Sequence, residues 1–267
     1  TNGYVTLSFG TDFQCIDEVW FSYTKSSGSI LLIDNFVTAS PVLAGQGPVV
    51  SDGFISITST PSGAASTYKI GDTVTASWDS TASGDNQSGI TGVTMDFSQF
   101  GGGSAVTATN SSGIWTASYT ITAGSVDATT RNVSVTATSS SGSTTTADTS
   151  NLSVDNIAPT VTDARISISG GSGTGGAFKI GDTVTATWNN TGSGDNNSDT
   201  ISSVTADFSQ FGGGSAVTAT NSSGTWSATY TIISGSIDAT GRNVSFTVTD
   251  NAGNTTTTSD STNATVD

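Results

Sequence analysis

The chain has 267 residues, with six Lys plus Arg against 21 Asp plus Glu, a formal net charge of −15, no histidine and one cysteine. The lack of histidine excludes a Ser-His-Asp triad, a Cys-His dyad and a His-bearing zinc site, and the single Cys15 excludes an intrachain disulfide. Six dispersed basic residues make no phosphate-binding surface, and no apolar run approaches the roughly 18 residues of a membrane span, so we expect neither nucleic-acid binding nor a membrane span. We also expect no enzymatic activity, because carboxylates without His, Cys or a convergent cleft give no specific catalytic signal. After these exclusions, we expect an acidic, β-rich protein of the extracellular space or cell surface.

Residues 1–43 differ in pattern from the rest of the chain and are predicted to form three strands, near 5–9, 19–21 and 30–33. Three strands cannot bury a core of their own. We therefore interpret 1–43 as the C-terminal strands of a preceding β-sandwich, or of one that another chain completes. The motif IDEVWF at 16–21, followed by LIDNF at 32–36, resembles the closing hairpin of jelly-roll carbohydrate-binding modules.

The rest of the chain is a long internal repeat. The segment 96–113, DFSQFGGGSAVTATNSSG, recurs unchanged at 207–224, and the segment 69–88 matches 179–198 at most positions. A period near 110 residues is too long for a solenoid unit and suits an independently folding domain. The predicted organisation is a first copy at 44–155 and a second copy at 156–267.

Within each copy, apolar residues alternate with Thr and Ser, as at 72–78, 114–121 and 132–137. Strict alternation between Gly-rich breaks is typical of half-buried antiparallel strands. About seven such strands in about 110 residues predict an all-β fold of two tandem immunoglobulin-like β-sandwiches. Four tryptophans on the apolar faces are expected in the cores rather than as sugar-stacking platforms: Trp78, Trp115, Trp188 and Trp226.

Asp, Asn and Gly gather in the loops of the second copy, which makes hard-cation binding the chemistry to test. Sandwich topology brings the interdomain linker, the B–C loop 194–199 and the F–G loop 250–254 to the same end of the domain. Oxygen ligands from three loops suit a six- to eight-coordinate Ca²⁺ ion better than Mg²⁺, although Asp and Asn are also ordinary turn formers. The candidate ligands are Asp155, Asn156, Asp195, Asn196, Asp199, Asp250, Asn251 and Asn254.

The first copy differs in these loops. Its F–G loop, 139–143, is Ser-Ser-Ser-Gly-Ser, and its leading linker, 45–47, has no Asp, so we expect little or no calcium at this entrance. The opposite end of the first copy holds Asp72 and the loop around Asp127, and Asp72 is a further candidate ligand facing the linker.

The phrases VDNIAP at 154–159 and VTDNAGN at 248–254 resemble the linker and F–G loop of bacterial immunoglobulin-like repeats. Such repeats occur in large secreted adhesins and surface proteins, where interdomain calcium commonly stiffens the array. The resemblance implies Asp155, Asp195, Asp199 and Asp250 as calcium candidates and neighbouring repeats as partners. The Ser-rich loop at 139–143 departs from this pattern.

Three functions are compatible with these observations. The leading hypothesis is a non-enzymatic structural and adhesive segment, a calcium-stiffened spacer of an extracellular surface protein. The second is a subunit of a filament or surface layer, in which strand addition between like subunits completes residues 1–43. The third is a carbohydrate-binding accessory region of a larger secreted enzyme, with a glycan bound by the N-terminal strands.

Overall fold

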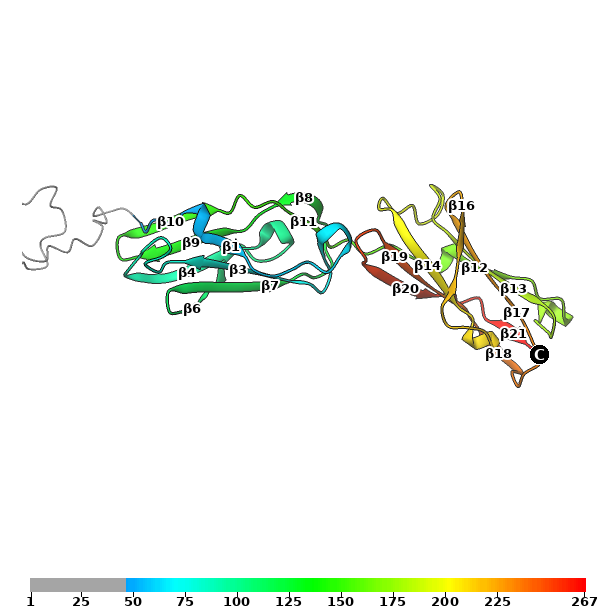
Figure 1. Cartoon of the computed structure of the whole chain (residues 1–267). Coiled ribbons are helices and arrows are strands. Elements are labelled where there is room, and N and C mark those ends of the chain that lie inside the picture. Colours follow the sequence, from blue (N-terminus) through cyan, green and yellow to red (C-terminus); the bar gives the residue numbers. More distant parts are fainter. Residues whose placement is uncertain (1–46) are drawn as a thin grey trace, which may run out of the picture.

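The computed structural model describes residues 47–267, and the strands predicted within 1–43 lie outside these described residues. The chain forms two β-sandwiches placed end to end, with the first copy leading into the second through residues 155–159 (Figure 1). The all-β prediction is confirmed, because every regular element other than short 3-10 turns in this part of the chain is a strand.

The first copy is a sandwich of two four-stranded antiparallel sheets. One sheet has the order β1-β3-β7-β6 and the other has the order β10-β9-β4-β5. Three 3-10 turns accompany these strands: η1 (Asp52–Phe54) before β1, η2 (Ala64–Ser66) after β1, and η3 (Ser98–Phe100) between β4 and β5. The strands are β1 (Ile55–Ile57), β3 (Thr73–Asp79), β4 (Ile90–Asp96), β5 (Val106–Thr107), β6 (Thr109–Ser111), β7 (Ile114–Thr120), β9 (Ser134–Ser139) and β10 (Gly142–Ala147).

The second copy repeats this arrangement, with sheets β12-β13-β17-β16 and β15-β14-β19-β20. Its turns are η4 (Asp163–Arg165), η5 (Thr174–Gly176) and η6 (Ser209–Phe211). Its strands are β12 (Ile166–Ser169), β13 (Thr183–Asn189), β14 (Ile201–Asp207), β15 (Val217–Thr218), β16 (Thr220–Ser222), β17 (Thr225–Thr231), β19 (Ser245–Asp250) and β20 (Thr255–Ser259).

Each copy also has a small extra sheet at its C-terminal end, which alternation in the sequence did not predict. In the first copy β2 (Thr67–Lys69), β11 (Leu152–Asp155) and β8 (Asp127–Arg131) lie in the order β2-β11-β8. In the second copy β18 (Ala239–Arg242) pairs with β21 (Ala264–Val266). The region expected as a loop around Asp127 is therefore a strand, because the backbone groups of β8 pair with those of β11.

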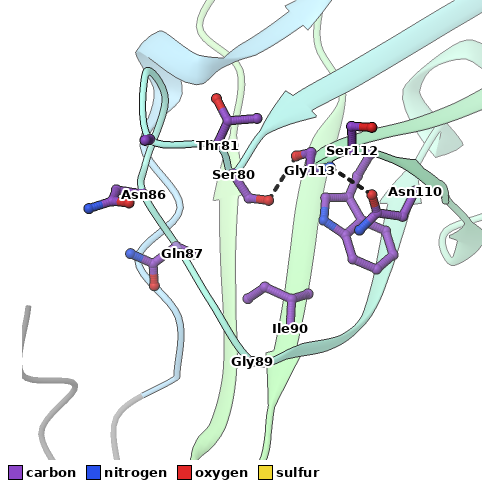
Figure 2. A pocket seen from close by; sticks show the side chains of 11 residues that line it. Ser80, Thr81, Asn86, Gln87, Gly89, Ile90, Asn110, Ser112 and Gly113 are labelled. Carbon is purple, nitrogen blue, oxygen red and sulfur yellow. Dashed lines mark hydrogen bonds between the residues drawn. The ribbon is translucent and has the colours of Figure 1, made fainter. Parts of the chain in front are cut away.

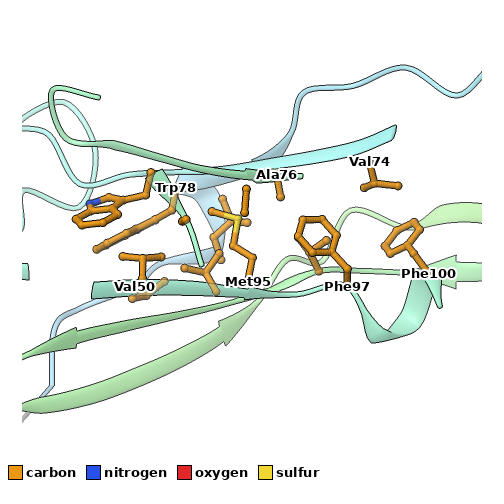
Figure 3. Close-up of a cluster of buried hydrophobic side chains, with 14 of the residues drawn as sticks. Val50, Val74, Ala76, Trp78, Met95, Phe97 and Phe100 are labelled. Carbon is orange, nitrogen blue, oxygen red and sulfur yellow. The ribbon is translucent and has the colours of Figure 1, made fainter. Parts of the chain in front are cut away.

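The four tryptophans lie in the two cores, as the alternation predicts. Trp78 and Trp188 are fully buried, and Trp115 and Trp226 are each 9% exposed. Trp78 lies opposite Trp115 across β3 and β7, and the second copy pairs Trp188 with Trp226 in the same way. Figure 3 shows part of the first core, with Trp78, Met95, Phe97 and Phe100 between the sheets. Trp78 and Trp188 therefore have no free face for stacking on a sugar, and Trp115 and Trp226 keep little exposed surface.

At one cross-strand pair the two cores have different residues that together fill a similar side-chain volume. Met95 lies opposite Val135 in the first copy, and the second copy has Ala206 opposite Phe246 at the same place. All four side chains are fully buried. A larger residue on one strand is offset by a smaller one on its partner, which close packing requires. The copies therefore share one sandwich architecture despite these exchanges in the core.

Within residues 47–267, no helix is long and apolar enough to cross a membrane.

Candidate metal centre

Three carboxylates converge where the first copy meets the second. Asp155, Asp199 and Asp250 each place a carboxylate oxygen within 4.8 Å of those of the other two. Asp155 and Asp250 are buried, at 3% and 1% exposed, and Asp199 is half-buried. The three residues come from three segments, the end of β11, the loop before β14 and the end of β19. These are three of the nine candidate ligands expected from the sequence.

Asp155 is held by the extra sheet of the first copy. It is the last residue of β11, where it pairs in parallel with Lys69 of β2 and in antiparallel with Asp127 of β8. One carboxylate oxygen, Oδ1, accepts a hydrogen bond of 2.9 Å from the Ile157 N–H as the chain turns into the second copy. Asp155 is thus fixed to the first copy rather than suspended in a linker.

Asp250 shapes the loop that follows β19. Its Oδ1 accepts hydrogen bonds from the N–H groups of Ala252, Gly253 and Asn254 at 2.9, 2.7 and 2.9 Å. Its second oxygen, Oδ2, is buried and has no hydrogen-bond partner. A buried carboxylate oxygen without a partner is costly, so this atom marks a position that a cation or an ordered water would fill.

Asp199 owes its position to the one-residue insertion in the second copy. The segment 195–198 matches 85–88 at three of four positions, but the second copy then reads Asp199-Thr200-Ile201 where the first reads Gly89-Ile90. Ile201 pairs with Asp250 as Ile90 pairs with Ser139. Asp199, in the segment with one extra residue, therefore places its carboxylate near the end of the strand pair at which Asp250 lies.

The electrostatics of the cluster disfavour three simultaneous negative charges. The pKa of Asp155 is raised to about 6, chiefly by burial; the Ile157 N–H lowers it, and the charges of Asp250, Asp127 and Asp199 raise it. Burial also raises the pKa of Asp199, and the charges of Asp127 and Asp250 act in the same direction. Like charges held together out of water destabilise the anionic forms unless a cation neutralises them.

The oxygen spacing and chemistry fit Ca²⁺. Two ligands on opposite sides of one Ca²⁺ are separated by about twice its 2.3–2.6 Å bond length, roughly 5 Å, and the three oxygens lie within that limit. Carboxylates Asp155, Asp199 and Asp250 would hold the ion, with backbone carbonyls and waters free to complete its coordination.

Asp195, another predicted ligand, uses both of its carboxylate oxygens in hydrogen bonds within the second copy. Its Oδ2 accepts hydrogen bonds from the Trp188 Nε1–H at 2.7 Å and the Thr162 N–H at 2.9 Å. Its Oδ1 accepts one of 2.6 Å from the Thr162 hydroxyl. Asp85 accepts the Trp78 Nε1–H at 2.7 Å in the first copy, so the shared role is to satisfy a buried indole.

Two predicted amides dock the copies on each other. Asn156 is 1% exposed and turns back onto the first copy, with its Oδ1 accepting the Val126 N–H at 2.7 Å. Asn254 is 3% exposed, and its Oδ1 accepts the Ile70 N–H of the first copy at 2.9 Å. Its Nδ2–H donates to the carbonyl of Asp155 at 3.2 Å. The remaining amides, Asn196 and Asn251, are exposed in their loops.

Asp72 lies at the far end of the first copy but is not part of the cluster. Its Oδ2 accepts the N–H groups of Ser62 and Lys69 at 2.9 and 3.0 Å, and the Ser62 hydroxyl donates to its Oδ1. These bonds lower the pKa of Asp72 against the raising effect of burial, which is the largest single influence. Asp182 makes the same three bonds with Ser172 and Lys179, so both residues hold a turn.

Asp127 is an acidic neighbour that was not among the predicted ligands. It begins β8 and lies opposite Asp155 in register, and its charge raises the pKa of Asp199. The sequence places Asp127 at the correct end of the first copy. Its alignment with Asp155 depends on the pairing of β8 with β11, for which the irregular sequence around 123–131 gives no periodic signal.

Within the described residues, the matching end of the first copy has no cluster of carboxylates: its B–C loop keeps Asp85, which accepts from the Trp78 indole. A cavity of about 360 Å³ beside its B–C loop includes Ser80, Asn86, Gln87 and Asn110 in its lining, and no carboxylate is among the residues that line it (Figure 2). The Ser80 hydroxyl donates to the carbonyl of Gly113 at 2.8 Å. Neutral amide and hydroxyl groups do not supply the charge that a Ca²⁺ site needs.

Comparison with known proteins gives only distant structural likenesses. No protein-family profile matches the chain, and no curated protein matches it. A titin Z1Z2 structure in complex with telethonin is 13% identical, with 80% of this chain and 96% of that chain covered and a TM-score of 0.24. The endo-fucoidan hydrolase MfFcnA4 of glycoside hydrolase family 107 is 17% identical over 74% of this chain, with a TM-score of 0.23.

A Bacteroides ovatus mixed-linkage glucan utilisation protein, SGBP-B, in complex with a heptasaccharide, is 19% identical over 74% of this chain and 42% of that chain, with a TM-score of 0.19. The match spans 27% of the fucoidan hydrolase chain. At these scores the likenesses carry no functional argument.

Proposed function

We propose that residues 47–267 form a non-enzymatic spacer of an extracellular or cell-surface protein, stiffened by one Ca²⁺ ion at the junction of the two copies. The observation that carries the proposal is the convergence of Asp155, Asp199 and Asp250, in which a buried Asp250 oxygen has no partner. A cation there removes the repulsion among the carboxylates and ties the end of β11 to two loops of the second copy.

Direct contacts between the copies support stiffness at the same place. The Ala64 N–H of the first copy donates to the carbonyl of Ala252 at 3.2 Å, and Asn254 accepts from Ile70. A Cβ at Gly63 would lie 2.7 Å from the same Ala252 carbonyl, so glycine permits this close approach. Stiffness serves a spacer because a flexible tether grows only as the square root of its length, whereas a rigid array projects its tip in proportion.

The two alternative functions, a filament or surface-layer subunit and a carbohydrate-binding accessory region, are supported by no specific observation among the described residues. Completion of residues 1–43 by a like subunit concerns the part of the chain outside them. Glycan binding by the N-terminal strands likewise concerns residues outside the described part of the chain.

Small-angle X-ray scattering of the chain with calcium and with EDTA tests the proposal. We expect calcium to narrow the distribution of interdomain distances, and Asp155→Asn to abolish that change. Asp267, the repeat counterpart of Asp155, is exposed, so Asp267→Asn is the matched control and should behave as the unaltered chain. Scattering profiles that calcium leaves unchanged would contradict the proposal.

A further inference from the structure

The acidic residues at the junction divide evenly between the two copies. Asp155 and Asp127 belong to β11 and β8 of the first copy, and Asp199 and Asp250 belong to the second. Asp155 and Asp127 are directly opposite each other in an antiparallel pair, which places their Cα atoms about 4.5–5.5 Å apart. A ligand set of this composition spans two folded units, unlike a set confined to a linker and one domain.

The position of Asp127 opposite Asp155 in the β8–β11 pair places it beside the cluster on the side of the first copy. Its charge raises the pKa of both Asp155 and Asp199. Asp127 itself is exposed, whereas the unpartnered Asp250 Oδ2 is buried. The cluster thus has a buried oxygen without a partner on one side and a solvent-facing carboxylate on the other, a combination that admits an ion from solvent.

Resting on the calcium site proposed above, we infer that Asp127 is a fourth ligand and that the ion joins the two copies into one cooperative unfolding unit. Unfolding of the first copy removes Asp127 and Asp155 from the site, and unfolding of the second removes Asp199 and Asp250. Whichever copy unfolds, the ion loses ligands. Ion binding therefore stabilises both copies, because a ligand that binds only the folded state opposes unfolding in proportion to its occupancy.

The repeat supplies a matched control for Asp127. Asp238 occupies the same position in the second copy, where it is exposed just before β18. Asp127→Asn and Asp238→Asn therefore make the same chemical change at equivalent sites, and only the first lies at the junction. In calcium titrations by calorimetry, we expect Asp127→Asn to weaken binding at least about 10-fold, a loss typical even of residues that only support a metal ligand. Asp238→Asn should bind calcium as the unaltered chain does.

Differential scanning calorimetry of the same proteins tests the coupling. With saturating calcium the unaltered chain should unfold in one transition, and with EDTA in two. Val248→Ala identifies the transition of the second copy, because it gives that copy the residue that the first carries at the equivalent position 137. Asp127→Asn at the same calcium concentration should separate the two transitions, and Asp238→Asn should not.

Two results would overturn the inference, and they can be told apart. If the unaltered chain binds no calcium, the proposed function fails and the inference fails with it. If calcium binds but Asp127→Asn titrates like Asp238→Asn, or calcium raises only the transition that Val248→Ala lowers, the junction site stands and Asp127 is neither a ligand nor a coupling residue.

Discussion

The leading ends of the two copies have the same strands and different chemistry. Ser139 ends β9 opposite Ile90 in the first copy, and Asp250 ends β19 opposite Ile201 in the second. The F–G loop that follows is Ser-Ser-Gly-Ser in one copy and Asn-Ala-Gly-Asn in the other. The comparison shows that Asp199, in the segment where the second copy has one extra residue, and Asp250, where the first copy has Ser139, add two carboxylates to this end without altering the sandwich.

The largest effect should be shared by both copies and come from their common core. Trp78→Ala and Trp188→Ala each remove a fully buried indole, which costs about 3–5 kcal/mol of unfolding free energy in the copy concerned. Urea denaturation followed by circular dichroism, with EDTA present throughout, should show losses of similar size. If only one of the two substitutions lowered the free energy of unfolding, the two cores would not be equivalent.

The next effect separates the copies. At a free calcium concentration 100-fold above the Kd, one bound ion adds about 2.7 kcal/mol to the free energy of unfolding. Asp250→Asn keeps an oxygen for the three N–H groups of the loop and removes the charge, so the calcium-dependent rise in melting temperature should disappear while the chelated protein is little changed. Ser139→Asp, the reverse exchange in the first copy, should create no second site, because that copy has no carboxylate at the position of Asp199.

A smaller effect distinguishes the metal ligands from the acids that serve the core. Asp195→Ala leaves the Trp188 indole N–H buried without its acceptor, which costs about 1–3 kcal/mol. Asp85→Ala should have the same cost in the first copy. Calcium affinity measured by titration should be unchanged in Asp195→Ala. A marked fall in that affinity would return Asp195 to the ligand set.

The smallest effect is the pH dependence of the junction. The pKa of Asp155 is raised to about 6 in the folded chain, above the value of about 3.9 expected when unfolded. Between these values the folded state binds more protons, so stability falls as pH rises through this window. With EDTA, the melting temperature should therefore be higher at pH 5 than at pH 7, and Asp155→Asn should reduce that difference. With calcium the trend should reverse, because protons compete with the ion for the same oxygens.

Period-2 alternation and the long repeat were sufficient to predict the sandwiches and the buried tryptophans, because both depend on burial that the sequence displays directly. The meeting of Asp155, Asp199 and Asp250 followed from chain order, since sandwich topology decides which loops share an end. The roles of Asp195 and Asp72, which the sequence suggested as metal ligands, were harder to predict. An Asp in a turn can accept backbone and indole hydrogen bonds or bind a cation, and only the positions of the donors distinguish these roles.

Calcium titration of the chelated chain, with the number of sites measured by calorimetry, tests the central claim most directly. The account predicts one tight site per chain, which Asp250→Asn abolishes and Asp267→Asn leaves intact. No binding, or two equivalent sites that survive Asp250→Asn, would contradict a single calcium site at the junction of the two copies.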